Sequence, residues 1–228
     1  MTYEHLPGRL DDIRERIFHS QRTRGFSHPV RIVAVTKGHN VEAVEAAIRA
    51  GIQDIGENRV QEALAKQDIV KRERATWHLI GSLQRNKVKQ VGDRFDWIHS
   101  VDRADLVDEL AKRLAGGRRQ KILVEVNCSG EAQKGGVPIA DAQALIARVV
   151  NHPGLEFAGL MTMAALSDEP EVSRIAFSRL RQLKAALEQG GVAVAELSMG
   201  MSGDFAVAVE EGATMIRLGT ILFGERAK

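Results

Sequence analysis

Hydrophobic positions along the chain follow two patterns in turn: short continuous runs and longer segments with a period of about 3.6 residues. Residues 31–36 form a β-branched run, and residues 41–50 follow as an amphipathic helix that ends before Gly51. The same pairing of strand and helix recurs along the chain. The further predicted strands cover residues 53–55, 77–80, 96–99, 121–126, 156–161, 194–197 and 214–217; the further predicted helices cover 59–70, 85–91, 104–115, 139–150, 171–189, 204–211 and a short segment from residue 220.

An additional helix is predicted before the first strand. Leu6, Leu10, Ile13 and Ile17 recur at helical spacing within residues 3–24. The eight units that follow average about 25 residues each, close to the minimum for a (β/α)8 barrel. The sequence therefore predicts an α/β fold: a single TIM-like (β/α)8 barrel with an N-terminal helix, forming one domain over residues 1–228. An open doubly wound sheet is the alternative, but the absence of an antiparallel strand and of a pronounced linker favours closure.

Composition and charge exclude several classes of protein. Hydrophobic residues make up 44% of the chain and charged residues 27%, as in soluble globular domains. No apolar run approaches the roughly 20 residues of a transmembrane helix, and the charged N-terminus is unlike a secretory signal. A net charge of +2, with seven Phe, two Trp and one Tyr, indicates no surface for nucleic acid. We expect a cytoplasmic protein without membrane or nucleic-acid partners, and the lack of an aromatic-rich exposed helix favours a monomer.

A lysine follows the first predicted strand directly, where a barrel of this kind places its reactive groups. Lys37 ends the motif AVTK at residues 34–37. Partial desolvation at the mouth of a barrel favours the neutral amine, which can attack an aldehyde. The same position also fits a surface lysine that ends a strand, so the residue makes Schiff-base chemistry available without requiring it.

Two later loops carry small and hydroxyl residues at the points where a barrel commonly binds phosphate. Residues 198–204 read SMGMSGD after the seventh strand, and residues 217–220 read RLGT after the eighth. Loops after these two strands, with the start of a short helix, form the usual phosphate site of the fold. We expect Ser198, Ser202 and the segment 219–220, with Gly219 and Thr220, to form this site. Ordinary helix capping by Ser202 and Thr220 is the alternative.

The lysine and the phosphate loops point to one ligand, because the first and eighth strands are neighbours in a closed barrel. Pyridoxal 5′-phosphate carries both an aldehyde and a phosphate. A phosphorylated sugar aldehyde, as in a Schiff-base aldolase, carries both groups as well. The residues alone leave the two ligands open.

Six motifs, in the same order along residues 31–224, are similar to those of the pyridoxal phosphate homeostasis protein family. They are AVTK at 34–37, IGEN at 55–58, WHLIG at 77–81, GLMTM at 159–163, LSMGMS at 197–202 and IRLGT at 216–220. The resemblance implies a fold-type III barrel, like the N-terminal domain of alanine racemase, that holds pyridoxal 5′-phosphate as a Schiff base on Lys37. It also implies that Arg217 approaches the pyridine nitrogen and keeps it unprotonated, which weakens the cofactor as an electron sink.

Three polar residues near strand ends are further candidates for this site. Asn58 follows the second strand and either orients groups at the cofactor ring or caps a helix. His78 and His99 either touch the cofactor or lie hydrogen-bonded in the barrel wall. We assign Asn58 and His78 to cofactor binding and leave the role of His99 open.

Sulfur-containing residues also gather near strand ends. Met161, Met163, Met199 and Met201 are expected to line the apolar side of the pocket, and no spacing typical of a metal site accompanies them. Cys128 is expected to be a small core or rim residue. The role of Lys134, which matches a lysine of the family, is left open.

The resemblance implies a protein that takes part in intracellular pyridoxal phosphate homeostasis, by buffering the cofactor or supplying it to apo-enzymes, without robust turnover. An amino-acid racemase or decarboxylase with the same cofactor is the alternative. Similar racemases take their second acid–base group from a tyrosine of an additional domain and a partner subunit. Here the only tyrosine is Tyr3, ahead of the barrel, although a histidine or Cys128 could substitute.

Overall fold

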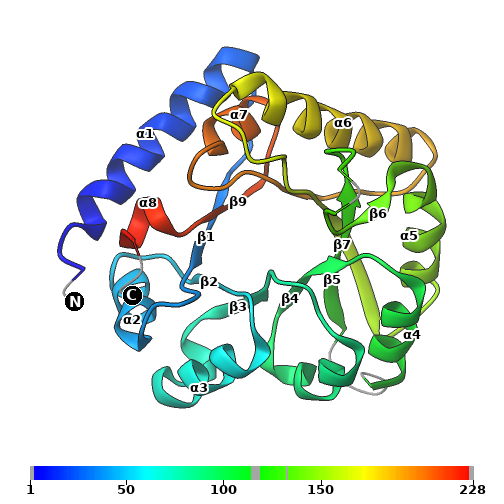
Figure 1. Cartoon of the computed structure of the whole chain (residues 1–228), viewed down its shortest axis with the longest axis horizontal. Helices are drawn as coiled ribbons and strands as arrows, with labels where there is room; N and C mark the ends of the chain where they lie inside the picture. Colours follow the sequence, from blue (N-terminus) through cyan, green and yellow to red (C-terminus); the bar gives the residue numbers. More distant parts are fainter. Residues whose placement is uncertain (1–2, 114–118, 132, 226–228) are drawn as a thin grey trace.

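The computed structural model describes residues 3–113, 119–131 and 133–225, and its centre is a closed ring of eight parallel strands (Figure 1). The ring consists of β1 (Arg31–Val35), β2 (Asp54–Glu57), β3 (Thr76–Leu79), β4 (Trp97–Val101), β5 (Gln120–Asn127), β7 (Leu155–Met161), β8 (Glu196–Ser198) and β9 (Met215–Leu218). Pairing of β4 with β5 and of β9 with β1 closes the ring. The predicted (β/α)8 barrel is confirmed. A two-residue strand, β6 (Val137–Pro138), was not predicted and pairs with the end of β5.

Helices surround the ring (Figure 1). They are α2 (Val41–Arg49), α3 (Val60–Val70), α4 (Ala104–Arg113), α5 (Ala142–Val150), α6 (Pro170–Gln189), α7 (Phe205–Glu210) and α8 (Thr220–Phe223). The predicted N-terminal helix is α1 (Leu6–Arg24), which lies against α7 and α8 and buries its apolar stripe. Within the described residues, no helix is long and apolar enough to cross a membrane.

Four short 3-10 helices occur in the described residues, and two of them lie where α-helices were predicted. Within the helix predicted at 85–91, residues 85–90 form a 3-10 helix, η2 (Arg85–Gln90), and η3 (Gly92–Arg94) follows after Val91. Val88 is the buried residue of η2, so this segment lacks the apolar stripe that anchors an amphipathic α-helix. Another 3-10 helix, η4 (Ile139–Asp141), precedes α5, and η1 (Arg72–Arg74) precedes β3. The predicted end of a helix at residue 115 lies outside the described residues.

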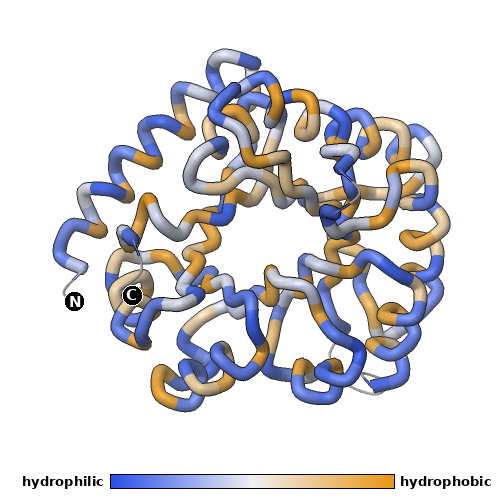
Figure 2. The backbone as a smooth tube through the Cα atoms, viewed as in Figure 1, coloured by the Kyte–Doolittle hydropathy of each residue, from blue (hydrophilic) through white to orange (hydrophobic). Residues whose placement is uncertain are grey.

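Alternation along the strands divides the buried side chains between two compartments. Ile98, Ile122 and Ile216 belong to the large apolar core between the ring and its helices. Their neighbours Trp97, Leu123 and Met215 form a second, smaller cluster. Figure 2 shows the matching pattern on the helices, where hydrophilic and hydrophobic stretches alternate along each turn. The same period of two places His78, His99 and Arg217 on the interior side of the ring.

A buried group of charges lies between the ring and α3, beneath the end of β1. Lys66 of α3 donates hydrogen bonds to Glu57 Oε1 at 2.7 Å, to the Thr36 carbonyl at 2.7 Å and to Glu62 Oε1 at 3.1 Å. The backbone N–H of Gly38 donates to Glu62 Oε1 at 2.6 Å. These contacts hold the backbone on both sides of residue 37. They therefore fix the direction in which the side chain of residue 37 extends from the end of β1.

Candidate functional site

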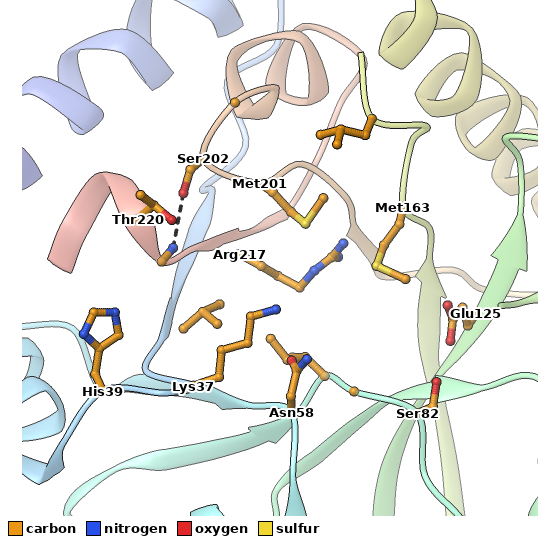
Figure 3. A pocket seen from close by; sticks show the side chains of 16 residues that line it. Lys37, His39, Asn58, Ser82, Glu125, Met163, Met201, Ser202, Arg217 and Thr220 are labelled. Atoms are coloured by element: carbon orange, nitrogen blue, oxygen red, sulfur yellow. Dashed lines mark hydrogen bonds between the residues drawn. The ribbon is translucent and has the colours of Figure 1, made fainter. Parts of the chain in front are cut away.

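A cavity of about 410 Å³ opens where the carboxyl ends of the ring strands meet (Figure 3). This volume lies within the usual range for small-molecule sites. The cavity gathers residues that lie far apart in the sequence. Seven of the nine predicted site residues line it: Lys37, Asn58, Met201, Ser202, Arg217, Gly219 and Thr220.

Lys37 follows β1 and extends into this cavity, where its ammonium group lies on the side facing Arg217 (Figure 3). The side chain is partly buried. An amine in such a setting can reach a carbonyl carbon of a ligand in the cavity, whereas an exposed lysine on the outer surface could not. The structure therefore favours the reactive interpretation of Lys37 over that of a surface residue ending a strand.

Asn58 lines the same wall of the cavity, directly after β2. The N-cap of α3 is Arg59, and no side chain caps this helix. Gly81 packs against the Asn58 backbone so closely that a Cβ at Gly81 would lie 2.3 Å from the Asn58 carbonyl oxygen. Asn58 therefore does not cap the helix, and its backbone is held at the rim by a contact that only glycine permits.

The loops after β8 and β9 are joined by a single hydroxyl group. Ser202 Oγ accepts hydrogen bonds from the backbone N–H groups of Gly219 and Ile221, each at 3.3 Å (Figure 3 draws the first). Asp204 Oδ1 in turn accepts the Met201 N–H at 2.6 Å. Thr220 does not cap α8, whose N-cap is Gly219 without a side-chain bond. Ser202 Oγ therefore accepts from N–H groups at the start of α8, as in the capping alternative. The same arrangement brings two hydroxyls and two backbone N–H groups together, a set of donors suited to an anion that would replace Oγ as their acceptor.

Arg217 lines the floor of the cavity and is only 4% exposed. Its guanidinium donates to the Ser198 carbonyl at 2.8 Å, to Ser198 Oγ at 2.7 Å and to the Thr162 carbonyl at 3.0 Å. Burial lowers the pKa of Arg217 to about 10, so the group stays a cation at neutral pH. Ser198 itself is fully buried and does not line the cavity; it acts on the site through Arg217.

His78 also lies away from the cavity lining, and the structure favours the alternative of a hydrogen-bonded histidine inside the barrel. Its ring is fully buried and stacks on Trp97 with the two planes 4° apart. One ring nitrogen lies 2.9 Å from Asp54 Oδ1 and the other 2.9 Å from His99 Nε2. Two nitrogens engaged in this way leave none to contact a ligand directly.

The remaining candidates divide between the cavity and the core. Met163 and Met201 line the cavity, but the expectation is wrong for Met161, which is buried in the smaller interior cluster, and for Met199, which is buried in the large apolar core. Cys128 is a buried core residue as expected, and burial raises the pKa of its thiol to about 11. Lys134 donates to the Ala164 carbonyl at 3.2 Å.

Glu125 of β5 is a cavity residue that the sequence analysis missed. Its side chain lies across the cavity from Lys37 (Figure 3) and is 3% exposed. Burial and, secondarily, repulsion from Asp102 raise the pKa of this carboxyl to about 7. The available signal was one carboxylate inside an otherwise apolar run at residues 122–126, in register with the interior-facing Leu123.

Comparison with known proteins places these features in a family. Residues 9–227 match the family model of the alanine racemase N-terminal domain. The chain is 40% identical over 221 residues to the pyridoxal phosphate homeostasis protein of Aquifex aeolicus, covering 96% of this chain and 97% of that protein. It is 35% identical over 229 residues to the protein of the same name from Escherichia coli, covering 95% of each.

Solved structures give the same result. PipY of Synechococcus elongatus, solved with PLP bound, is 36% identical with a TM-score of 0.84, covering 96% of this chain and all of that one. A histidine racemase from Leuconostoc mesenteroides is 21% identical with a TM-score of 0.78. The match covers 98% of this chain but 58% of the racemase chain, and it supports the fold alone. The chain therefore belongs to the alanine racemase N-terminal domain family and, within it, to the pyridoxal phosphate homeostasis proteins.

Proposed function

We propose that this protein binds pyridoxal 5′-phosphate as a Schiff base on Lys37 and takes part in the homeostasis of that cofactor in the cytoplasm, buffering it or supplying it to apo-enzymes. The observation that carries the proposal is that Lys37 and the joined loops of Ser202 and Gly219 open onto one cavity. The relatives' shared name and the PLP bound in PipY support it.

The residues present fit this cofactor. Ser202, Thr220 and the N–H groups of Gly219 and Ile221 would hold the phosphate, and a side chain at Gly219 would crowd the site, since a Cβ there lies 3.3 Å from the Val35 carbonyl oxygen. Arg217 would present a cation to the ring, and Asn58 and Met201, which line the same cavity, would contact it. When bound, the cofactor supplies an aldehyde that condenses reversibly with an amine. A cation beside the pyridine nitrogen disfavours protonation there, which suits storage better than turnover.

Absorption spectroscopy of the purified protein tests this proposal. Incubation with pyridoxal 5′-phosphate should produce the visible band of a Schiff base, because the conjugated imine absorbs at longer wavelength than the free amine and aldehyde. Borohydride should then fix the cofactor to the peptide that contains Lys37, since reduction turns the reversible imine into a stable amine. A protein that gains no band and no labelled peptide would rule the proposal out.

The phosphate loops predict a selective effect of Ser202→Ala. The variant should bind pyridoxal 5′-phosphate about tenfold more weakly or worse, because a hydrogen bond to a charged group contributes roughly 1.5–3 kcal/mol. Its affinity for pyridoxal, which lacks the phosphate, should be unchanged and weak, as in the wild type. Fluorescence titration of both proteins with both ligands measures this. Equal weakening for the two ligands would show that Ser202 supports the loops only.

Glu125 favours one second candidate function, a racemase or decarboxylase that uses the same cofactor. A carboxyl group with a pKa of about 7 in the cavity can exchange a proton at neutral pH. The usual alternative donor is not available, because Tyr3 does not line the cavity and its hydroxyl contacts Asn40 Oδ1 at 3.3 Å and His39 Nδ1 at 3.4 Å.

We expect no more than trace turnover of L-alanine, L-serine, L-ornithine and L-lysine by the PLP-loaded protein. The reason is that each missing proton-transfer group forfeits a factor of about 10² to 10⁴ in rate, and Arg217 opposes a delocalised carbanion. The assay follows α-proton exchange and chirality in deuterated water. Slow exchange without racemisation agrees with the proposal. Turnover of about 1 s⁻¹ or faster, the lower end of ordinary enzymes, would establish the enzyme instead, and its loss in Glu125→Gln would name the acid–base group.

A further inference from the structure

A continuous chain of hydrogen bonds crosses the interior of the barrel to Arg217. Asp54 Oδ1 lies 2.9 Å from His78 Nε2, and His78 Nδ1 lies 2.9 Å from His99 Nε2. On the other side of its ring, His99 Nδ1 lies 3.0 Å from Ser198 Oγ, which is 2.7 Å from Arg217 Nη1. Four strands besides that of Arg217 contribute to this chain, β2, β3, β4 and β8.

One direction of donation satisfies every contact of this hydrogen-bond chain while both imidazoles stay neutral. A guanidinium only donates, so Ser198 Oγ accepts from Arg217 and has its own proton to give to His99 Nδ1. His99 must then carry its proton on Nε2 and donate it to His78 Nδ1. His78 in turn carries its proton on Nε2 and donates it to the Asp54 carboxylate. Both imidazoles are therefore neutral, with the same tautomer.

The surroundings of the two rings agree with neutral imidazoles. Both histidines are fully buried. Burial lowers the pKa of His78, although the Asp54 carboxylate opposes this shift. Burial also lowers the pKa of His99 well below its usual value, and the nearby Arg217 and Arg31 act in the same sense there. A second proton on His99 would remove the acceptor of the Ser198 hydroxyl and place a cation beside Arg217.

Arg217 depends on this chain of hydrogen bonds more than a surface arginine paired with a carboxylate would. Within the described part of the protein, its hydrogen-bond acceptors are the neutral oxygens of Ser198 and Thr162. A neutral hydroxyl is a stronger acceptor when its own proton is donated onward, because hydrogen bonds in a chain polarise one another. Asp54, 21% exposed at the opposite end of the barrel, supplies the negative end of the chain.

We infer that His99 is a positioning residue for Arg217: it takes the Ser198 hydroxyl proton and so orients the oxygen on which the guanidinium rests, while His78 and Asp54 hold His99 in the tautomer that can do this. His99 does not line the cavity, so it would not contact a ligand bound there. The inference rests on the proposed function in one respect, that Arg217 contacts the bound cofactor. It gives His78, which the sequence suggested as a direct ligand, an indirect role.

Two substitutions of His99 separate this role from simple support of the fold. Asparagine places its Oδ1 near the position of Nδ1 and can still accept from Ser198, but it cannot reach His78. Glutamine places its amide nitrogen near the position of Nε2 and can still donate to His78, but it leaves the Ser198 hydroxyl without its acceptor. Each variant removes the imidazole ring of residue 99 and keeps one of its two hydrogen bonds, to Ser198 or to His78. The two variants are therefore matched controls for stability, and thermal unfolding compares their midpoints.

The two variants should differ in cofactor binding. His99→Asn is expected to keep the dissociation constant for pyridoxal 5′-phosphate within about threefold of the wild type, with an unchanged absorption maximum. His99→Gln is expected to weaken binding by about tenfold and to shift the maximum, because a misplaced cation alters the field at the pyridine ring. Equal affinities and spectra in the two variants would overturn the inference.

Nitrogen-15 NMR of the histidine rings tests the chain without any cofactor. At neutral pH, His78 and His99 of the wild-type protein should both show one protonated Nε2 and one unprotonated Nδ1. A proton on Nδ1 of either ring, or a cationic ring, would overturn the inference. A wild-type protein that shows these tautomers but binds no cofactor would instead contradict the proposed function. The chain of hydrogen bonds from Asp54 to Arg217 would still be supported.

Discussion

Replacing Lys37 with alanine is expected to abolish borohydride-stable attachment of pyridoxal 5′-phosphate altogether and to leave the barrel folded. An alanine has no amine to form the imine, so the covalent part of the binding is lost and only contacts to the phosphate and the ring remain. The fold should survive because the side chain at residue 37 is partly exposed in the cavity, whereas the contacts that hold the loop involve Thr36, Gly38 and Lys66.

Mass spectrometry after borohydride reduction measures this effect, and circular dichroism checks the fold. Lys89→Ala, which removes an exposed lysine of η2, is the matched control and should be labelled like the wild type. Labelling of the Lys37→Ala protein at another lysine to the wild-type extent would contradict the assignment of Lys37.

The fold was predictable because its information is local. Each strand is a short apolar run and each helix an amphipathic segment, so periodicity located the eight units. A barrel then places residues that follow strands at one rim, and this rule located Lys37, Ser202 and Thr220 before any contact was known. It failed at residues 85–91, where two buried valines, Val88 and Val91, gave too little amphipathic pattern to distinguish an α-helix from 3-10 turns.

Interior contacts were less predictable, because they depend on which strands face each other across the ring. His78 and His99 lie near strand ends in the sequence, where they resemble rim residues. Their contact with each other needs the register of the neighbouring strands β3 and β4, and the contact of His99 with Ser198 exists only once closure brings β4 and β8 across the ring from each other. Glu125 was missed for a related reason. Its pKa is raised by burial and by Asp102, and both effects depend on the folded barrel.

The charges beneath Lys37 give the second large effect, a loss of stability in Lys66→Met. Lys66 is 6% exposed and Glu57 is fully buried, with their charged atoms 2.7 Å apart. Methionine fills a similar volume but leaves the Glu57 carboxylate without its cation, although Thr36 Oγ1 still donates to it at 2.5 Å. Removing one partner of a buried ion pair typically costs about 3–5 kcal/mol of unfolding free energy. We expect a loss of this size at about pH 8, measured by urea unfolding.

The loss of unfolding free energy in Lys66→Met should become smaller as the pH falls, because of how Glu57 titrates. Burial, its largest influence, raises the pKa of Glu57 above the usual value, and Lys66 opposes that rise. In Lys66→Met the pKa of Glu57 in the folded protein rises further. Between the pKa of Glu57 in the unfolded chain and its pKa in the folded protein, the native state therefore binds more protons than the unfolded state. Stability therefore falls as pH rises through this window and is recovered toward about pH 5.

A second substitution isolates the charge as the cause. Glu57→Gln added to Lys66→Met removes the orphaned carboxylate, so the double variant should be more stable than Lys66→Met at about pH 8 and lose most of its pH dependence. An equal loss at both pH values, or no recovery in the double variant, would show that Lys66 matters through packing alone. Because the same lysine holds the Thr36 carbonyl, Lys66→Met should also loosen the loop that aims Lys37 and weaken cofactor binding at every pH, even where stability has recovered.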